Sequence, residues 1–436
     1  MRFFIRTFGC QMNKSDSEVA AGTLLAAGHQ ETPEPAEAEL IVINTCAVRE
    51  HAVERLYGYI NSLKSPAKHN QAPLLAIGGC VAEQKRGRLW KELPQANIIF
   101  GTRAFHLLPQ AIERAIGGEA RIDLLQPLEP LPEHPSIRPE DPWRAWLPIS
   151  RGCNNFCSYC VVPHTRGRET SRSSATVLAD AAALAAQGVR EITLLGQNVN
   201  SYGNDLGKPG LFASLLLSLD EIPDLRRVRF LTSHPKDLSG ETIAALAASA
   251  NACECVHLPL QAGSDRILAA MNRGYTLEKY LERVTALRSA IPGVALSTDL
   301  IVGFPGETEE EFEETLAAVE HIRYDSAYTF IYSPRPGTPA AELPDGVAWR
   351  TKETRLRQLI ELQSTISQQV NQACVGRVLE VFVTGPSRRG EASWTGRTRT
   401  NKIVNFPATG DLAGRFVSVE ITSAGVASLG GQYVGR

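Results

Sequence analysis

The sequence predicts an α/β protein of three successive parts: a doubly wound parallel sheet, a partial (β/α)6 barrel and a small β-barrel. Short apolar runs alternate with helical patterns through the first two parts, an order typical of parallel sheets. After residue 373 the composition changes to glycine and β-branched residues, which favour strands. Residues 126–142 are rich in proline and can form neither a helix nor an interior strand. We therefore expect domains at residues 1–125, 143–373 and 374–436, with a linker at 126–142.

In the first domain, a strand is expected at residues 3–8 and a helix at 15–27, which Gly28 ends. The same order then recurs along the chain, with strands at 40–43, 74–77 and 98–100 and helices at 50–63 and before Gly117.

Cys10, Cys46 and Cys80 each follow one of these strands. Parallel strands bring their carboxyl ends to one edge of a sheet, where ligands bind. A single cysteine there would be explained as a small buried apolar residue. Three cysteines at equivalent places favour ligation of one iron–sulfur cluster, and the lack of a fourth would leave one iron open.

The second domain carries six apolar runs that predict the strands of a partial barrel, at residues 145–149, 191–195, 227–231, 254–258, 295–302 and 327–332. Thr276 and Thr308 precede helical patterns and are typical N-cap residues. A long helix at about 348–373 is expected to close this barrel.

A loop in this domain holds Cys153, Cys157 and Cys160, three soft thiolate ligands within eight residues. Iron–sulfur clusters normally take four such ligands, so this set too would leave one iron open for a substrate. The alternative is a Cys3His zinc site that includes His164, and the polar and glycine residues at later strand ends argue against it.

The third domain is expected to contain strands at residues 378–384, 403–406 and 416–422. It has eight basic and four acidic residues, a local net charge of +4. A basic small barrel with Trp394 and Phe406 among its arginines is a reasonable RNA platform. A merely solvated basic face is the alternative. The residues expected to contact RNA are Arg388, Arg389, Arg397, Arg399 and Lys402.

The composition excludes a general polyanion binder, because the formal net charge of the 436 residues is −2. Nine cysteines, clustered as described, favour metal ligation in a reducing compartment over disulfides. We interpret Cys253, Cys255 and Cys374 as structural. The chain shows neither a signal peptide nor an apolar run of about 18 residues, so we expect a cytoplasmic monomer with no membrane partner.

The three-cysteine loop resembles that of the radical S-adenosylmethionine (SAM) superfamily, and residues 149–168 resemble its methylthiotransferase branch. The segments around Cys10, Cys46 and Cys80 resemble the N-terminal domain of that branch, and residues 374–436 resemble its TRAM module. The resemblance implies two [4Fe–4S] clusters, one that binds SAM and an auxiliary one that carries sulfur. Glu83 and Gln84 depart from the family pattern without touching a ligand.

The resemblance also implies SAM contacts at the strand ends of the barrel. Gln197 would receive the amino group, Arg273 the carboxylate, and Ile301 and Gly303 the adenine. From the residues alone, Gln197 could instead cap a loop and Arg273 could form a surface salt bridge. The complete expected set is Gln197, Ser233, Gln261, Arg273, Asp299, Ile301 and Gly303.

Residues 232–235, 271–275 and 396–401 resemble the branch that modifies N6-isopentenyladenosine at position 37 of tRNA. The implied reaction places a methylthio group on C2, where an aromatic C–H offers no leaving group for polar substitution. Prenylated tRNA, an external one-electron donor and a sulfur source would be its partners. The alternatives are the sibling enzymes for threonylcarbamoyladenosine or ribosomal protein S12, or a non-enzymatic iron–sulfur RNA-binding sensor.

Overall fold

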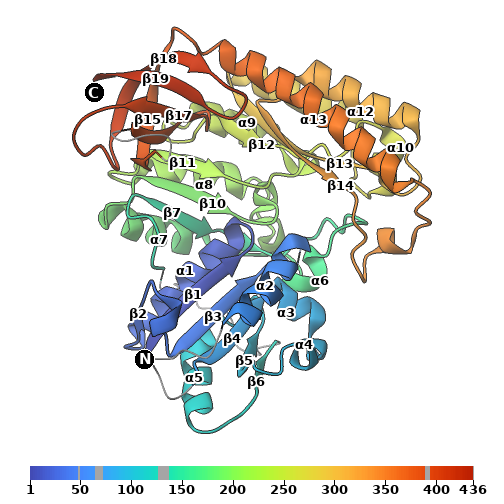
Figure 1. Ribbon diagram of the computed structural model, residues 1–436. Coiled ribbons are helices and arrows are strands. Elements are labelled where there is room, and N and C mark those ends of the chain that lie inside the picture. Colours follow the sequence, from blue (N-terminus) through green and yellow to red (C-terminus); the bar gives the residue numbers. More distant parts are fainter. Residues whose placement is uncertain (48–49, 64–71, 126–136, 388–392, 436) are drawn as a thin grey trace.

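The computed structural model describes residues 1–47, 50–63, 72–125, 137–387 and 393–435, which form three domains (Figure 1). In the described part of the first domain, six parallel strands lie in the order β2-β1-β3-β4-β5-β6. The strands are β1 (Arg2–Phe8), β2 (Gln30–Glu31), β3 (Leu40–Thr45), β4 (Leu74–Gly79), β5 (Ile98–Phe100) and β6 (Ile122–Leu124).

Helices cover both faces of this sheet. Leu40 and Val42 of β3 pack on the side of α1 (Gln11–Ala26) and α5 (Leu108–Ile116). Ile41 and Ile43 point the other way, because alternate residues of a strand face opposite sides. The helices on that side are α2 (Glu50–Ser62), α3 (Cys80–Lys85) and α4 (Gly87–Glu92). The predicted doubly wound sheet is therefore confirmed.

The second domain forms the expected partial barrel from two hydrogen-bonded sheets, β11-β10-β7 and β12-β13-β14. The amide of Val228 donates to Asn251 O and the amide of Cys253 to Val228 O, both at 2.8 Å, so the sheets lie edge to edge. The strands are β7 (Arg144–Pro148), β10 (Glu191–Leu195), β11 (Arg227–Phe230), β12 (Cys255–His257), β13 (Ala295–Val302) and β14 (Ser326–Ile331).

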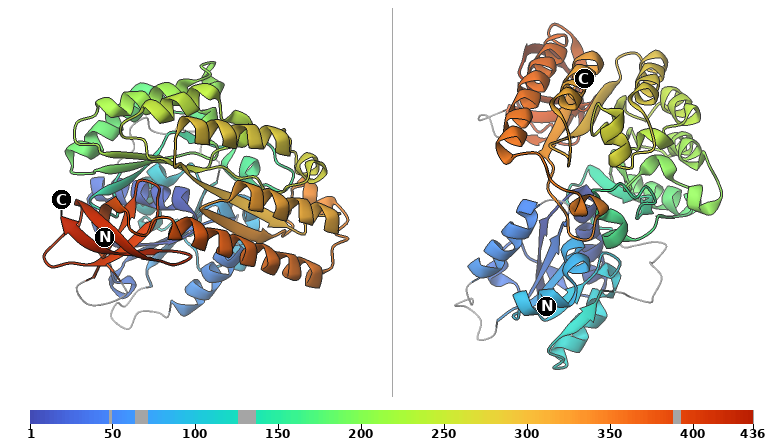
Figure 2. Two further views of the ribbon diagram at one scale, coloured as in Figure 1. Left: turned by 90° about the horizontal axis from the view of Figure 1, so that it is seen from above. Right: turned by 90° about the vertical axis from the view of Figure 1, so that its right-hand side faces the viewer.

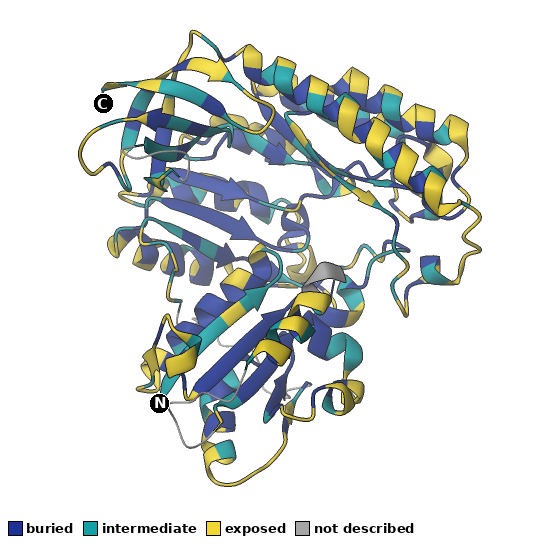
Figure 3. Ribbon diagram, viewed as in Figure 1, coloured by how far each residue is buried: buried dark blue, intermediate teal, exposed yellow. Residues whose placement is uncertain are grey.

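Helices cover the outer face of these strands and share one apolar core with them (Figures 2 and 3). Thr276 and Thr308 cap helices as predicted, since their hydroxyls accept from the amides of Lys279 and Glu311. The helices are α7 (Ser174–Ala186), α8 (Leu211–Ser218), α9 (Gly240–Ala248), α10 (Asp265–Ala270), α11 (Leu277–Ala290), α12 (Glu309–Ile322) and α13 (Trp349–Gln372).

The third domain is a closed barrel in the order β15-β16-β17-β19-β18. The strands are β15 (Val378–Pro386), β16 (Ser393–Thr398), β17 (Ile403–Pro407), β18 (Phe416–Ala424) and β19 (Leu429–Gly435). Sequence patterns did not predict β16 or β19, which contain glycines. Gly396 of β16 is needed because a Cβ there would lie 2.4 Å from Phe382 O. Among the residues described, no helix combines the length and apolar character needed to cross a membrane.

Candidate active site

The first three cysteines lie at the carboxyl ends of three neighbouring strands. Cys10 follows β1 and precedes α1, Cys46 follows β3, and Cys80 follows β4 and begins α3. Strand β3 pairs in parallel with both β1 and β4. Helices α1 and α2 follow β1 and β3 and lie on opposite faces of the sheet, so the strand order reverses between β1 and β3. In α/β proteins, ligands bind in the crevice at such a reversal.

The thiols of this trio interact with one another. Hydrogen bonding with Cys46 lowers the pKa of Cys10 to about 5, and the charge of Arg166 acts in the same direction although burial opposes it. Burial raises the pKa of Cys80, and here the charge of Arg166 opposes the rise. Three thiols and one guanidinium thus share a small region.

Two buried asparagines hold this region in place. Asn13 Oδ1 lies 3.2 Å from Cys10 Sγ, and Asn13 Nδ2 donates to Asn44 Oδ1 at 3.0 Å. Asn44 Nδ2 donates back to Asn13 O at 2.7 Å. Gly79 has a φ of +93°, and a Cβ there would lie 2.4 Å from Asn44 Oδ1. Sequence reasoning missed both asparagines, although each stands within three residues of a cysteine.

The second trio lies in the loop between β8 (Ser150–Arg151) and α6 (Val162–Arg166). The amide of Cys153 donates to Gly167 O at 3.1 Å, and the amide of Cys160 donates to Cys157 O at 3.0 Å. Burial raises the pKa of Cys160 to about 12, and the nearby Cys157 and Cys153 add to the rise. The loop therefore folds its three thiols toward one another.

Both cysteine trios suit a four-iron cluster better than a single ion. In the described ranges, no three His, Cys, Asp or Glu side chains converge closely enough to hold one metal ion. His164 is exposed on α6, so the Cys3His zinc alternative has no support. In a four-iron cluster each thiolate binds a different iron. Cysteines that lie near one another but do not converge on a single point fit that arrangement.

Buried ion pairs join the two trios. Arg166, at the end of α6, donates to Asp16 Oδ2 of α1 at 2.9 Å, and Arg151 lies 3.0 Å from Asp16 Oδ1. The Asp16 side chain is 0% exposed and that of Arg166 is 4% exposed. Arg166 contacts the first trio and follows Cys160 by six residues in the chain. Helix α6 packs against α3 (Figure 1), so the second loop reaches the first cysteine site.

Several predicted SAM contacts lie beside the second loop with unused polar atoms. The amide of Gly152 donates to Gln197 Oε1, which ties that side chain to the loop. Ser233 Oγ and Gln261 Oε1 are buried and have no hydrogen-bond partner within the described part of the chain, and the same holds for Nε2 of His234, which was not predicted as a SAM contact. Such groups are costly unless a ligand satisfies them, and they suit the amino, carboxylate and hydroxyl groups of SAM.

Arg273 is buried next to the cysteine loop. Its guanidinium donates to Cys157 Sγ at 3.2 Å, to Pro259 O at 3.0 Å and to the Tyr275 hydroxyl at 3.0 Å. The alternative of a surface salt bridge is wrong, because the residue is 5% exposed. Its predicted contact with the SAM carboxylate stays a prediction.

The remaining predicted SAM contacts lie on β13 and just after it. Asp299 lies 3.4 Å from His257 Nε2, and the neighbouring Ile301 faces the same side of the strand. Gly303 has a φ of +69°, and its amide donates to Glu307 Oε2 at 2.6 Å. Glu307 in turn pairs with Arg355 at 2.9 Å, so a buried carboxylate fixes the turn after β13.

The predicted RNA contacts have other partners where the structure describes them. Arg399 forms an ion pair with Glu254 at 2.8 Å, and Lys402 forms one with Asp325. Arg397 donates to Asn401 at 3.0 Å. Arg399 and Lys402 hold the small barrel against the second domain, and Arg397 fixes the β16–β17 turn within the barrel. Arg388 and Arg389 lie outside the described residues.

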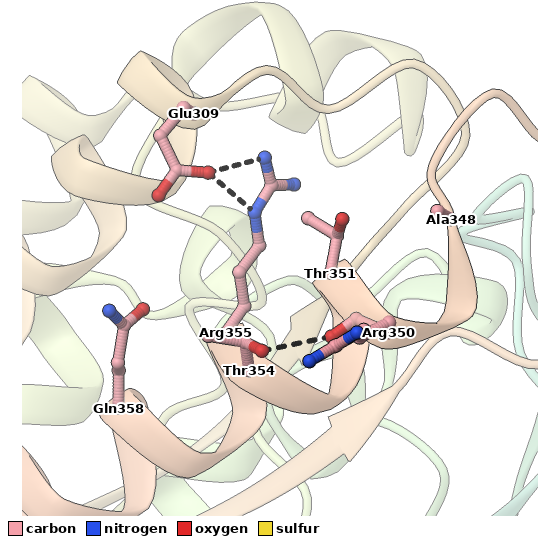
Figure 4. A pocket seen from close by; sticks show the side chains of 7 residues that line it. All are labelled: Glu309, Ala348, Arg350, Thr351, Thr354, Arg355 and Gln358. Carbon is pink, nitrogen blue, oxygen red and sulfur yellow. Dashed lines mark hydrogen bonds and ion pairs between the residues drawn. The ribbon is translucent and has the colours of Figure 1, made fainter.

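A separate cavity of about 350 Å³ lies where α12 and α13 begin. Figure 4 shows Arg355 at its wall, where the guanidinium reaches Glu309. Its lining residues are Glu309, Ala348, Arg350, Thr351, Thr354, Arg355 and Gln358, and none of them was predicted as a site residue.

Three known families match successive parts of the chain. Residues 2–101 match the family described as Uncharacterized protein family UPF0004, residues 147–319 match the Radical SAM superfamily and residues 372–434 match the TRAM domain. Both cysteine trios lie within the first two matched segments.

Named proteins are similar to this chain over 99% of its length. The chain is 47% identical to the tRNA-2-methylthio-N(6)-dimethylallyladenosine synthase of Carboxydothermus hydrogenoformans, with 99% of both chains covered. The chain belongs to this synthase family. The synthase of Acetivibrio thermocellus is 45% identical, with 99% of this chain and 91% of that protein covered.

Solved structures share the fold of this chain. The radical S-adenosylmethionine methyltransferase TsrM of Kitasatospora setae, solved with cobalamin and a [4Fe–4S] cluster, gives a TM-score of 0.57 at 14% identity, with 90% of this chain and 80% of that chain covered. That likeness concerns the fold. The synthase relatives and the superfamily match together show a radical SAM enzyme, and this superfamily uses SAM and a [4Fe–4S] cluster.

Proposed function

We propose that this enzyme adds a methylthio group to C2 of N6-isopentenyladenosine at position 37 of tRNA. The observation that carries the proposal is the contact of Arg166 with the Cys10, Cys46 and Cys80 region from a helix that follows the Cys153, Cys157 and Cys160 loop. Two cysteine centres side by side are what a reaction that combines radical formation with sulfur insertion requires. The relatives in this family carry the corresponding name.

We assign two [4Fe–4S] clusters to the two cysteine trios, with SAM on the second. When bound, these groups supply a 5′-deoxyadenosyl radical at the second site and sulfur with its methyl group at the first. Thiolates are the form that binds iron, and burial opposes ionisation of Cys80 and Cys160, so nearby cations must offset part of that cost.

Two buried arginines of the chain can offset part of that cost. Arg166 is cationic beside Cys10 and Cys80, and Arg273 donates to Cys157 Sγ. A buried guanidinium next to a thiol stabilises the thiolate and the negative charge of a ligated cluster. Asn13 orients Cys10 through its amide group.

The proposed SAM site uses the unpartnered atoms at the strand ends. Ser233 Oγ and Gln261 Oε1 would bind polar groups of SAM, and the turn at Gly303 would let the backbone approach its adenine. We also propose that the remaining partners are an external one-electron donor and a sulfur source, and that the enzyme works on tRNA in the cytoplasm.

The test is an anaerobic reaction of the reconstituted enzyme with SAM, a chemical reductant and prenylated tRNA, followed by mass spectrometry of the tRNA nucleosides. We expect 2-methylthio-N6-isopentenyladenosine together with 5′-deoxyadenosine. Product on threonylcarbamoyladenosine or on ribosomal protein S12 would assign the chain to a sibling activity. Formation of no 5′-deoxyadenosine at all would favour the non-enzymatic sensor.

A further inference from the structure

The inner face of the last barrel strand carries two exposed aromatic side chains. Along β14 the residues alternate, and Ala327 and Ile331 pack against the core of the domain. Tyr328 and Phe330 face the other way and are 60% and 49% exposed. Neighbouring large apolar side chains that are exposed on a sheet face indicate a binding site, so this face is a candidate.

The register of the sheet shows what surrounds these rings. Tyr328 pairs with Asp299 and Phe330 pairs with Ile301 across β13. The Tyr328 ring lies edge-on to the His257 ring, with centroids 5.9 Å apart. His257 itself contacts Asp299 at 3.4 Å. An aromatic surface therefore lies beside a row of polar side chains on the same face.

Hydrogen bonds connect this face to the cysteine loop. The amide of Ile301 donates to Gln261 O at 2.9 Å, and two residues earlier Pro259 O accepts from Arg273 at 3.0 Å. Arg273 contacts Cys157. The aromatic pair is thus separated from a cluster ligand by a short series of direct contacts.

The small barrel lies at the end of this aromatic face where β14 begins. Lys402 pairs with Asp325, the residue before β14, and the charge of Arg397 reaches Tyr328. Between these limits β14 has six residues, which span about 20 Å. That length accommodates a nucleotide, and six residues are far fewer than the roughly 20–30 that a protein interface of standard size uses on each side.

We propose that Tyr328 and Phe330 bind the adenine ring and the N6-isopentenyl group of the tRNA substrate, and so determine the preference for prenylated tRNA. This inference rests on the proposed function. Aromatic side chains stack on unpaired bases, and the same rings bury a branched five-carbon chain. The row of His257 and Asp299 offers hydrogen-bonding groups to the edge of the base.

The experiment compares prenylated and unprenylated forms of one tRNA with the reconstituted wild type and with Phe330→Ala, Tyr328→Ala and the double variant. Burial of five carbons supports a wild-type preference of about a hundredfold in kcat/KM. We expect Phe330→Ala to reduce kcat/KM for prenylated tRNA by at least about tenfold and to reduce the value for unprenylated tRNA by a smaller factor, because both substrates carry the adenine ring and only one carries the isopentenyl group. Phe330→Leu, which keeps an apolar side chain, should restore part of the preference.

Leu217→Ala is the matched control, because Leu217 is 43% exposed on α8 of the same domain. SAM cleavage without tRNA, iron content and size-exclusion elution are measured for every variant and should not change.

A double variant that keeps the wild-type preference overturns the inference. Loss of SAM cleavage at normal iron content overturns it too, because the face would then hold SAM, and a change in oligomeric state would show a protein interface. If the wild type cleaves SAM but forms no methylthio product on prenylated tRNA, the proposed function itself fails.

Discussion

At the scale of single residues, Asp16 carries the junction between the first two domains. Its carboxylate is fully buried between Arg151 and Arg166, which flank the second cysteine loop. Removal of one partner from a buried ion pair leaves uncompensated charge, which costs about 3–5 kcal/mol. The same change would release Arg166 from its position beside Cys10.

We therefore predict that Asp16→Asn lowers the thermal unfolding midpoint and reduces iron incorporation at the first cysteine site. Calorimetry and iron analysis of the anaerobically reconstituted protein measure both effects. Glu119→Gln, which breaks an exposed pair with Arg114, should leave both values unchanged. An Asp16→Asn protein with the wild-type midpoint and iron content would show that the ion pair has no role in joining the domains.

Glu18 of α1 should make stability depend on pH. Burial raises the pKa of Glu18 from its ordinary value of 4.5 to about 7, nearby Glu140 and Asp141 add to the rise, and Lys14 and a hydrogen bond from the Glu140 amide oppose it. Between these two pH values the folded state holds a proton that the unfolded state has lost, so stability falls as pH increases from about 4.5 to 7. The loss approaches about 3 kcal/mol above pH 7.

Glu18→Gln is predicted to remove this loss, since the amide keeps the acceptor for the Glu140 amide and does not ionise. The midpoint of the variant should exceed that of the wild type at pH 8 and approach it at pH 5, as measured by thermal unfolding in matched buffers. Equal differences at the two pH values would contradict the raised pKa of Glu18.

At the scale of elements, the sequence predicted strands better than the short helices at the cysteines. Helix α1 begins at Gln11, four residues before the predicted start at residue 15. Its first turn carries polar residues, among them the buried Asn13, so the apolar periodicity appears late. Helix α3 begins at Cys80 itself and was missed, because six residues are too few to show a helical period.

The candidate site shows the same limit. The six cysteines could be predicted from spacing and position, since metal ligands depend on residue type. The ion pairs of Asp16 with Arg151 and of Arg399 with Glu254 could not be predicted. They join residues that are 135 and 145 positions apart in the chain. Pairing of that kind depends on how domains pack, which local patterns do not report.

The two cysteine loops should be separable by substitution. Cys157→Ala is predicted to abolish SAM cleavage, whereas Cys46→Ala should keep some cleavage without forming the methylthio product. Iron should fall from about eight per chain to about half in either variant, since each keeps one complete trio. The measurements are iron analysis and assay of 5′-deoxyadenosine under anaerobic conditions. Four irons in the wild type would refute a second cluster.

At the scale of the whole molecule, buried arginines fix the small barrel to the second domain. Arg227 and Arg229 of β11 donate to the backbone oxygens of Arg397, Thr398 and Arg399, at 2.7 to 2.9 Å. Arg227 is 0% exposed. Deletion of the small barrel after Ala373 would therefore remove partners from buried charges, so loss of tRNA binding in that truncation could reflect damage to the second domain. Single substitutions distinguish a loss of RNA contacts from damage to the second domain.

Arg399 tests whether the basic turn of the small barrel contacts RNA or serves the domain junction. Its guanidinium is held by both carboxylate oxygens of Glu254, at 2.9 and 2.8 Å, and by Ala252 O at 2.6 Å. A phosphate contact contributes close to one to the slope of log affinity against log salt. We predict that Arg399→Ala lowers the unfolding midpoint and leaves that slope for tRNA binding unchanged.

Arg388 and Arg389 stay predicted RNA contacts. Arg388→Ala and Arg389→Ala should each reduce the slope by about one without a change in midpoint. A reduced slope in Arg399→Ala at an unchanged midpoint would mean that Arg399 leaves Glu254 to bind the tRNA.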